Sequence, residues 1–376
     1  MPLAQRMSLL GTETAFEVFT KAKALEAQGK DVVHLHIGAP DFETPPNIVE
    51  AGQRALRDGW HKYTPAKGLM ELREAVVEDL LARRGAEVNP EHVLIVPGGK
   101  PTMFFAILMF GEPGSEILYP NPGFPIYESV IQWSGATPVP IELREENGFT
   151  FSADAVLAKI TPATRLMILN SPANPTGGVV QRAEMDRLAE GLEQHPHVTI
   201  LSDEIYSRLL YDGEEHVSIL NYPALRERAI LLDGWSKTYA MTGWRLGYGV
   251  WPADLIDHAE RIQINSVSCA NAATQIAAIE ALRGPQEAVE EMRTAFDERR
   301  KIIHAELNDI SGFSCVMPKG AFYAFPNTSG TGLSSMQLEK QFLYEAGVAC
   351  LSGSSFGALG EGYLRFSYAN SIENIR

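Results

Sequence analysis

The sequence predicts an α/β protein with a mostly parallel central sheet, and three observations lead to this prediction. From residue 92 to about residue 250, short apolar runs alternate with segments of helical periodicity, which is typical of α/β proteins. Polar residues able to bind a ligand follow several of these runs, where open α/β sheets place their binding sites. From about residue 285 the sequence changes character, which indicates a second, smaller α+β domain.

Short apolar runs bounded by turn residues are typical of buried strands. We expect strands at His92–Val96, Glu116–Tyr119, Leu166–Leu169, Val198–Leu201, Ile230–Leu232 and Leu246–Val250. The loop between the last two is too short for a crossover helix, so we expect these two strands to be antiparallel neighbours. Helices are expected at 13–30, 48–58, 101–110, 124–134, 181–194, 253–263, 271–283, 286–307 and 334–346.

The larger domain is expected to span residues 46–284 and to contain the sheet. The later segment holds a long charged helix, two expected short strands around Gly320, and a last strand with Arg365 inside its apolar run. The N-terminal segment is too short to form a domain alone. We therefore expect residues 1–45 to join residues 285–376 in a discontinuous smaller domain.

Composition and charge limit the class of protein. An apolar content of 45% and a charged content of 21% are ordinary for a globular protein in solution. A formal net charge of −15 argues against nucleic acid or an anionic membrane as the main partner. The longest apolar run, Met103–Phe110, is far short of the roughly 20 residues that span a bilayer. With three scattered cysteines and no leader pattern, we expect a cytoplasmic protein without disulfides or a zinc site.

Four of the expected strand ends carry residues that suit catalysis. Gly98-Gly99-Lys100 opens a helix after the first strand, Asn174 follows the third, and Asp203 and Tyr206 follow the fourth. A small polar turn presenting Ser236 and Lys237 follows the fifth. A lysine at the end of buried strands loses hydration, which lowers the pKa of its amine and makes it a nucleophile. A lone lysine would more simply be a surface residue, but packing does not explain this convergence.

These residues suit one cofactor better than the common nucleotides. Free N–H groups at the glycine-rich helix start favour a phosphate group. Val93 stands where a P-loop needs its first glycine, and no G-x-G-x-x-G follows a strand, so ATP and NAD are disfavoured. A phosphate site, a nucleophilic lysine and a carboxylate together indicate pyridoxal phosphate, because Asp203 can keep its pyridine nitrogen protonated. Taken alone, Asp203 would more simply be a helix N-cap.

The sequence resembles the class I, fold-type I pyridoxal-phosphate aminotransferases, near their bacterial aspartate, aromatic and alanine branch. The resemblance runs in family order from residue 31 to residue 371, and the ordered set is far more specific than any one motif. It is carried by LHIGAPDFETP, YTPAKGLMELREAV, PGGK, SPANPTG, LSDEIY, SKTYAMTGWRLGY, KGAFYAF and LRFSYANS.

The resemblance implies a role for each matching residue. Lys237 would bind the cofactor as a Schiff base and then carry the proton between substrate and cofactor. Asp203 would pair with the pyridine nitrogen, and Tyr206 and Asn174 would hydrogen-bond the phenolic oxygen. Phe124 would stack on the ring, although an ordinary core aromatic is a competing interpretation. The phosphate would be held by the backbone of Gly99 and Lys100 and by Ser236 and Arg245.

The resemblance also implies substrate contacts and a homodimer. Arg365 would bind the substrate α-carboxylate in a bidentate manner, with Asn174 nearby and Gly38 leaving room. For Gly38, a plain turn glycine is nearly as good an interpretation. Tyr63 would reach the phosphate of the neighbouring subunit. The substrates would be an amino acid and a 2-oxo acid, exchanged by a ping-pong mechanism through pyridoxamine phosphate.

Two positions depart from the family pattern. Many relatives carry a serine three residues before the lysine as a phosphate ligand, whereas this chain has Gly234. The usual GEPDF loop reads Gly38-Ala39-Pro40-Asp41-Phe42, which changes the rim facing the substrate. The first departure affects the expected cofactor affinity, but not the identity of the cofactor.

The substrate stays open at this stage. The segment Asn265–Gln275, which lies near the neighbour's site in related enzymes, has no basic residue to bind a distal carboxylate. Lys67 is a possible substitute, although a solvated loop lysine is the simpler interpretation. Dicarboxylic, aromatic and small neutral amino acids all stay open, with 2-oxoglutarate or pyruvate as acceptor. A C–S lyase or a related elimination would use the same residues, and a non-catalytic regulator is a remote alternative.

Overall fold

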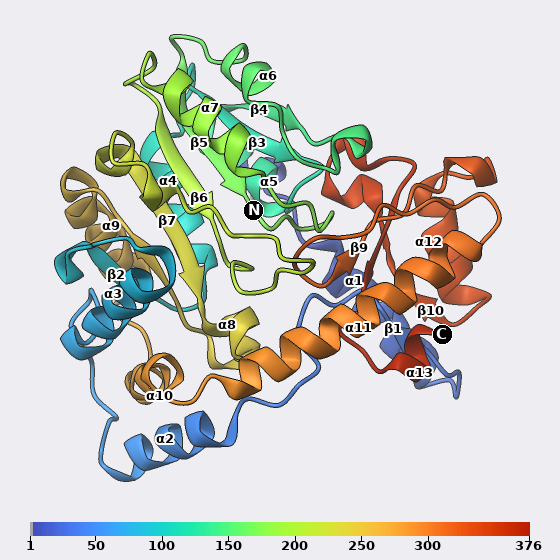
Figure 1. Ribbon diagram of the computed structural model, residues 1–376, viewed down its shortest axis with the longest axis horizontal. Helices are drawn as coiled ribbons and strands as arrows, with labels where there is room; N and C mark the ends of the chain where they lie inside the picture. Colours follow the sequence, from blue (N-terminus) through green and yellow to red (C-terminus); the bar gives the residue numbers. More distant parts are fainter. Residues whose placement is uncertain (1–2) are drawn as a thin grey trace.

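A seven-stranded sheet forms the centre of the computed structural model, which describes residues 3–376 (Figure 1). The strand order is β2-β8-β7-β6-β5-β3-β4. All neighbours are parallel except β8, which is antiparallel to both β2 and β7. The predicted mostly parallel sheet and the antiparallel pair around the lysine are therefore confirmed. The strands are β2 (Val93–Val96), β3 (Glu116–Asn121), β4 (Thr137–Glu142), β5 (Thr164–Asn170), β6 (Thr199–Asp203), β7 (Ala229–Gly234) and β8 (Gly247–Val250).

Strand β4 is the one member of this sheet that the sequence did not predict. It lies at the sheet edge and pairs in parallel register only with β3. Its residues Pro138 and Pro140 interrupt the apolar pattern and cannot donate hydrogen bonds. An edge strand tolerates them because one of its sides needs no ladder partner, and this is why a proline-containing segment can be a strand here.

Helices cover both faces of the sheet, and successive residues of a strand point to opposite cores. In β5, Leu166 and Ile168 belong to one core cluster, whereas Met167 and Leu169 belong to the other. The first cluster includes residues of α4 (Lys100–Phe110), α5 (Ile126–Ser134) and α9 (Ala253–Ser266). The second includes residues of α2 (Pro46–Arg57), α3 (Met70–Arg84), α6 (Ala153–Leu157), α7 (Arg182–Leu192) and α10 (Ala272–Arg283). Burial on both faces explains why these strands are continuously apolar.

The segments at the two ends of the chain meet in a second group of elements. Strand β1 (Val33–His34) pairs in parallel with β10 (Val348–Ala349). Strands β11 (Leu351–Ser352), β12 (Leu364–Ser367) and β9 (Tyr323–Ala324) form a small antiparallel sheet. Around them lie α1 (Thr14–Glu26), α11 (Glu287–Asp309), α12 (Ser335–Tyr344) and α13 (Ile372–Ile375). The long helix α11 packs against β9 and α13 and, with its other end near α10, connects the two groups (Figure 1).

Three predicted elements differ in the structure. Only β9 forms where two strands were expected around Gly320. The segment before Gly320 makes only an isolated bridge between Ser314 and Asn327, and the backbone N–H of Gly320 donates to Gly177 O at 3.0 Å. Helix α1 ends at Glu26, four residues before its predicted end, and a turn through Gly29 at φ 83° follows. Ser236 and Lys237 lie on a short helix, α8 (Trp235–Thr238), rather than in a turn.

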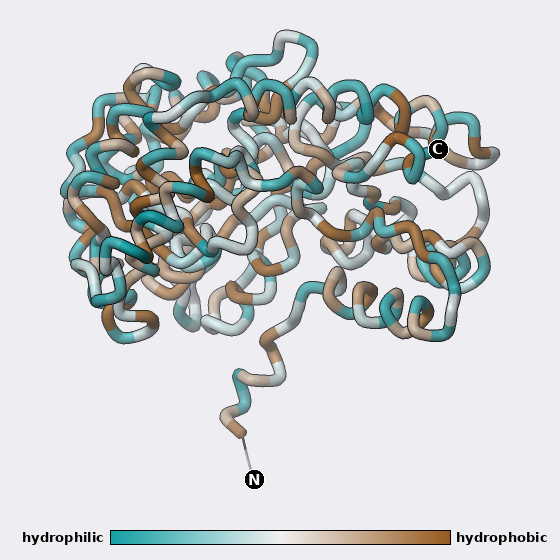
Figure 2. The backbone as a smooth tube through the Cα atoms, turned by 90° about the horizontal axis from the view of Figure 1, so that it is seen from below, coloured by the Kyte–Doolittle hydropathy of each residue, from teal (hydrophilic) through white to brown (hydrophobic). Residues whose placement is uncertain are grey.

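The first described residues extend away from the body of the molecule (Figure 2). Leu3, Met7, Leu9 and Leu10 are exposed in this segment. The segment is attached where the backbone N–H of Gly11 donates to Ser129 Oγ at 2.8 Å. Within residues 3–376, no helix combines the length and the apolar character that a membrane crossing requires.

Candidate active site

A cavity of about 540 Å3 lies at the carboxyl ends of the central strands, where ligands collect in open α/β sheets. Strand β5 ends at Asn170, β6 ends at Asp203, and α8 follows β7 directly. All but one of the residues predicted from the sequence line this cavity. They are Gly38, Gly99, Lys100, Phe124, Asn174, Asp203, Tyr206, Ser236, Lys237, Arg245 and Arg365. Tyr63 does not line it and is 90% exposed.

Lys237 is held inside the cavity by the first turn of α8. Its Nζ donates a hydrogen bond to the backbone oxygen of Gly38 at 2.5 Å. Burial, and then the positive charge of Arg365, lower the pKa of Lys237 to about 8. A substantial fraction of this amine is therefore neutral near physiological pH, which is the state in which a lysine acts as a nucleophile or a base.

Asp203 lies buried at the end of β6 and faces the same cavity. Tyr127 donates its hydroxyl to Oδ2 of this carboxylate at 2.6 Å, and the N–H of Ile205 donates to Oδ1 at 3.3 Å. Burial raises the pKa of Asp203 to about 6, although both hydrogen bonds oppose this effect. A cation placed beside this carboxylate would be stabilised, and it would return the pKa of Asp203 to lower values.

Arg365 is a buried cation on β12. Its Nη1 donates to Asn174 Oδ1 at 2.9 Å, and its Nη2 donates to the backbone oxygen of His36 at 2.6 Å. Its guanidinium carbon lies 4.5 Å from the ring centre of Tyr323 and 4.8 Å from that of Phe356. Within residues 3–376 it forms no ion pair, and its Nε has no hydrogen-bond partner. A buried charge is costly to leave unpaired, so this geometry favours binding of an anion.

Tyr206 and Asn174 line the wall between Asp203 and Arg365. The hydroxyl groups of Tyr206 and Tyr323 lie 2.7 Å apart, and their rings meet edge to face. Burial raises the pKa of Tyr206 well above its usual value, so its hydroxyl stays protonated and can donate a hydrogen bond. The N–H of Asn174 donates to Asn170 Oδ1 at 3.0 Å, which fixes the loop after β5.

The glycine-rich start of α4 and the side chain of Arg245 form a cradle for an anion. Gly98 has φ 82°, and a Cβ atom there would lie 2.1 Å from Arg245 Nη2. Arg245 itself has a left-handed backbone, φ 54°, and its Nη1 donates to Thr242 O at 2.8 Å. Gly99 is the N-cap of α4, so free N–H groups of this helix and the Ser236 side chain border the same space.

The remaining sequence-predicted residues take different positions. Phe124 precedes α5 and meets the ring of Tyr127 edge to face at 5.7 Å. A Cβ atom on Gly38 would lie 2.2 Å from the hydroxyl of Tyr323, so glycine at this position allows Tyr323 to approach. Lys67 does not line the cavity of its own chain, and its ammonium pairs with Asp257 at 3.5 Å.

Among the residues of the cavity wall that the sequence did not single out, three have ionisable side chains: Glu13, Tyr127 and Tyr323. Tyr323 stands inside the motif KGAFYAF, and Tyr127 follows Phe124 by one helical turn. Glu13 forms an ion pair with the side chain of Lys100. Glu13 lies in the N-terminal segment, far from the strand ends in sequence, and no local pattern indicates that it reaches the cavity.

Comparisons with known proteins identify the family. The family model of the class I and II aminotransferases matches residues 30–376. The chain is 40% identical to an aspartate aminotransferase of Pyrococcus horikoshii, over 99% of this chain and 94% of that protein. It is 37% identical to aromatic-amino-acid aminotransferase 2 of Thermococcus litoralis, over 100% of this chain and 96% of the relative.

Solved structures agree with this assignment. The aspartate aminotransferase of Thermus thermophilus, solved with maleate, superposes with a TM-score of 0.94 at 36% identity, covering 100% of this chain and 97% of that one. The aromatic aminotransferase of P. horikoshii superposes with a TM-score of 0.89 at 38% identity, covering 94% and 95%. The chain belongs to the class I and II aminotransferases. It is a pyridoxal-phosphate-dependent enzyme with the fold-type I architecture.

The residues of this aminotransferase fit pyridoxal phosphate. The cradle formed by Gly98, Gly99 and Arg245 suits a phosphate, because it combines a guanidinium with free N–H groups. Asp203 suits the cationic pyridine nitrogen, since it is a buried carboxylate without a cationic partner in the described chain. Lys237 suits the aldehyde, because its amine is buried and its pKa is lowered.

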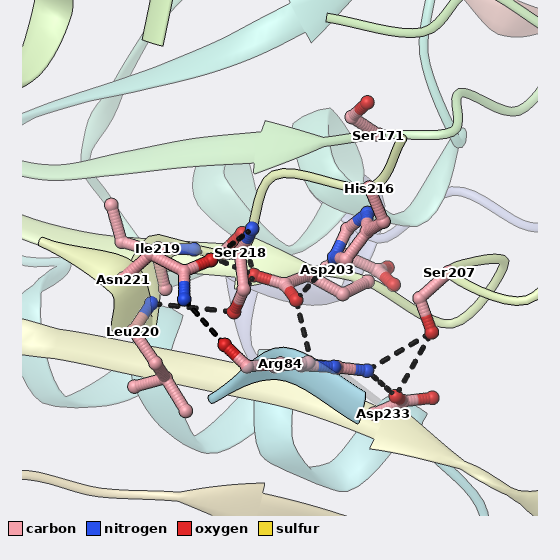
Figure 3. A network of polar contacts seen from close by, with 12 residues as sticks. Arg84, Ser171, Asp203, Ser207, His216, Ser218, Ile219, Leu220, Asn221 and Asp233 are labelled. Carbon is pink, nitrogen blue, oxygen red and sulfur yellow. Dashed lines mark hydrogen bonds and ion pairs between the residues drawn. The ribbon is translucent and has the colours of Figure 1, made fainter. Parts of the chain in front are cut away.

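A buried polar network supports the strand ends of this aminotransferase from behind (Figure 3). Arg84, at the end of α3, donates to Glu204 Oε2 at 2.6 Å and forms an ion pair with Asp233. Glu204 also pairs with His216 at 2.6 Å. Burial alone would raise the pKa of Glu204, but His216 and Arg84 lower it to about 2. Because Glu204 directly follows Asp203, this network fixes the end of β6.

Gly234 has a structural role in this aminotransferase. It pairs with Gly247 across β7 and β8, and a Cβ atom on Gly234 would lie 2.8 Å from Gly247 Cα. The backbone of Gly247 in turn lies against Gly98 and Gly99. A serine at position 234 would therefore push against the strand that supports the anion cradle.

Proposed function

We propose that the enzyme transfers the amino group of an amino acid to a 2-oxo acid within this cavity. The proposal rests mainly on three residues that face one cavity: Lys237, Asp203 and Arg365. Lys237 has a lowered pKa, and the buried side chains of Asp203 and Arg365 form no ion pair in the described part of the chain. Lys237 can bond covalently to the cofactor, Asp203 can pair with its cationic ring, and Arg365 can bind an anionic substrate.

Each side chain has a defined task in this proposal. Arg365 binds the α-carboxylate through its guanidinium fork, which brings the substrate Cα toward Lys237. The Nζ atom of Lys237 then accepts the proton from the substrate Cα. It delivers this proton to the cofactor's aldehyde carbon, on the other side of the transferred nitrogen. Pyridoxal phosphate, when bound, supplies a carbonyl that bonds amines and a ring that withdraws electrons from Cα. Asp203 stabilises positive charge at the ring nitrogen. Tyr206 and Asn174 donate hydrogen bonds to the phenolic oxygen of the ring.

Five further residues hold the cofactor in this proposal. The backbone N–H groups of Gly99 and Lys100 and the side chains of Ser236 and Arg245 bind the phosphate. Phe124 packs against one face of the ring, which its place on the cavity wall supports. Gly38 leaves the space in which Tyr323 and the substrate carboxylate meet.

The substrates follow a ping-pong order in this proposal. The first amino acid leaves as its 2-oxo acid, and a second 2-oxo acid then takes up the amino group. Aspartate, aromatic and alanine-type donors are proposed, with 2-oxoglutarate or pyruvate as acceptor. Relatives named aspartate aminotransferase and aromatic-amino-acid aminotransferase support this range.

We further propose that the enzyme works in the cytoplasm as a homodimer with shared sites. Tyr63 is 90% exposed, and the apolar side chains of Leu56, Trp60, Ile264 and Val267 are exposed as well. A partner subunit that covers Tyr63 would bring its own Tyr63 to the phosphate. We also propose a larger domain, 46–284, and a smaller domain of residues 1–45 and 285–376, which the pairing of β1 with β10 supports.

A half-reaction screen tests the proposed chemistry. The purified, cofactor-loaded enzyme is mixed with one amino acid at a time, without any oxo acid, and its visible absorbance is followed. Transamination converts the cofactor to its pyridoxamine form and releases one equivalent of 2-oxo acid. Continuous release of pyruvate or ammonia without this spectral change would instead demonstrate a C–S lyase or another elimination.

A further inference from the structure

Four cationic side chains line the active-site cavity, and one of them, Lys100, forms an ion pair with a carboxylate. Within residues 3–376, Lys237, Arg245 and Arg365 form no ion pair with a carboxylate. Lys100 is paired with Glu13, and its ammonium also lies 5.5 Å from the ring centre of Phe124. The proposed function uses the first three cations for the cofactor, the proton and the α-carboxylate. Lys100 is thus the cation left to meet a substrate side chain.

Glu13 is positioned for this contact by the N-terminal segment. It is the N-cap residue of α1, but its side chain makes no capping hydrogen bond. Its carboxylate instead points to Lys100 and is 18% exposed. The stretch from Glu13 to Phe16 forms one wall of the cavity and is tied to α5 by the hydrogen bond from Gly11 N to Ser129 Oγ.

The charge of Glu13 acts inside the cavity. Burial and Arg365 lower the pKa of Lys237, and the carboxylate of Glu13 opposes this effect. Burial also lowers the pKa of Arg365, and Glu13 again acts in the opposite direction. Glu13 is therefore close enough to influence both groups that handle the substrate, as well as the ion pair with Lys100.

The remaining wall of the cavity is apolar around this ion pair. Arg365 fixes the α-carboxylate, and Asp203 and Arg245 face the cofactor, so the side chain of the substrate is left with the wall near Glu13. Phe16, Ile37 and Phe356 belong to the same cavity lining. An uncharged side chain meets an apolar wall and a neutralised lysine, whereas a distal carboxylate meets Glu13 as a like charge.

We propose that Glu13 is a specificity-determining residue: by neutralising Lys100, it makes the enzyme prefer amino acids with uncharged side chains over dicarboxylates. The inference rests on the proposed function, because it needs the α-carboxylate to bind at Arg365. Neither Glu13 nor the side chain of Lys100 takes part in the proton transfer.

The variant Glu13→Gln tests the proposal, with aspartate and phenylalanine as probes. Half-reaction rates followed by visible absorbance give kcat/KM for each probe. We expect the ratio of kcat/KM for aspartate to kcat/KM for phenylalanine to rise by about fivefold, which corresponds to the upper end of the range for one surface ion pair. The double variant E13Q/K100Q should lose this gain, because the gain depends on the freed ammonium. Glu17→Gln, an exposed glutamate on the same helix outside the cavity, should leave the ratio unchanged.

Two outcomes would overturn the proposal. One is an unchanged ratio in Glu13→Gln, and the other is an equal gain in E13Q/K100Q. Glu13→Ala is measured beside Glu13→Gln, with far-UV circular dichroism as the check on folding, so the result does not depend on one variant. A wild-type enzyme that converts no amino acid would contradict the proposed function itself, whatever the variants show.

Discussion

Lys237 shows how a common side chain becomes reactive through its position. Its amine is enclosed between the end of β7 and Gly38, and Arg365 adds a positive charge to the same cavity. Desolvation and like charge both disfavour the ammonium form, so the pKa of Lys237 falls to about 8. The sequence predicted this burial from the apolar strand before the lysine. It did not predict the contribution of Arg365, which comes from β12, far along the chain.

The lowered pKa gives a prediction for the cofactor-free protein. Below pH 8 Lys237 is mostly protonated and cannot attack the cofactor aldehyde, whereas above pH 8 it is mostly neutral. The rate of pyridoxal phosphate incorporation should therefore rise with pH to a midpoint near 8 and then level off. Stopped-flow visible absorbance over a pH series measures this rate. A rate still climbing steeply at about pH 10, as for an ordinary lysine, would contradict the prediction.

The sequence indicated cavity residues where a short local pattern marks them. Asp203 was singled out because it follows the end of an expected strand, and Arg365 because a charged residue in an apolar run needs an explanation. Tyr127 and Glu13 were missed for a physical reason. Their roles depend on which elements the fold brings together, and Tyr127 reaches Asp203 across 76 residues of sequence.

At the scale of elements, the site depends on how closely β7, β8 and the start of α4 pack together. Gly234, Gly247 and Gly98 meet in successive close contacts. The sequence predicted β7 and β8 as antiparallel neighbours, because the intervening loop is short. It did not show that glycine at position 234 is required by this packing, since contacts between backbones of different strands leave no local pattern.

The variant Gly234→Ser tests this packing. The Cβ atom of a serine at position 234 would lie 2.8 Å from Gly247 Cα. We expect the free energy of unfolding in urea to fall by about 1–3 kcal/mol. Gly243→Ser is the matched control, because a Cβ atom there meets no atom within 4 Å. Equal stability of the two variants would count against this explanation.

The network behind Asp203 provides a second prediction at this scale. Arg84→Met would leave the buried carboxylates of Glu204 and Asp233 without their cation. Removal of one partner from a buried ion pair costs about 3–5 kcal/mol. We expect the free energy of unfolding in urea to fall by this amount. Arg54→Met is the control, since its pair with Glu50 is exposed and worth at most about 0.5 kcal/mol. If the free energy of unfolding fell as little in Arg84→Met as in Arg54→Met, the network would not have the role given to it.

At the scale of the whole molecule, the cavity lies where the sheet meets the elements from both ends of the chain. Glu13, Gly38 and Arg365 reach it from the terminal segments, whereas Asp203 and Lys237 reach it from the sheet. The order of motifs along the chain predicted this arrangement through the family resemblance. Alternating apolar runs alone predicted the sheet but not edge strand β4, whose prolines hide its pattern.

In the proposed homodimer, Tyr63 of one subunit reaches the active site of the other. We expect a particle of twice 41.3 kDa by light scattering, and Tyr63→Phe should raise the Kd for pyridoxal phosphate by about tenfold, because one hydrogen bond to a charged group is lost. Tyr344→Phe, at another exposed tyrosine, is the control. A monomeric enzyme, or an unchanged Kd in Tyr63→Phe, would contradict shared sites.

We propose that Lys237 both holds the cofactor and moves the proton. Lys237→Ala tests it most directly, because the variant keeps Arg365, Asp203 and the phosphate cradle. We predict that turnover with the best amino acid from the half-reaction screen falls at least about a thousandfold, while pyridoxal phosphate still binds and can be removed by dialysis. Turnover within about tenfold of the wild type would contradict the account.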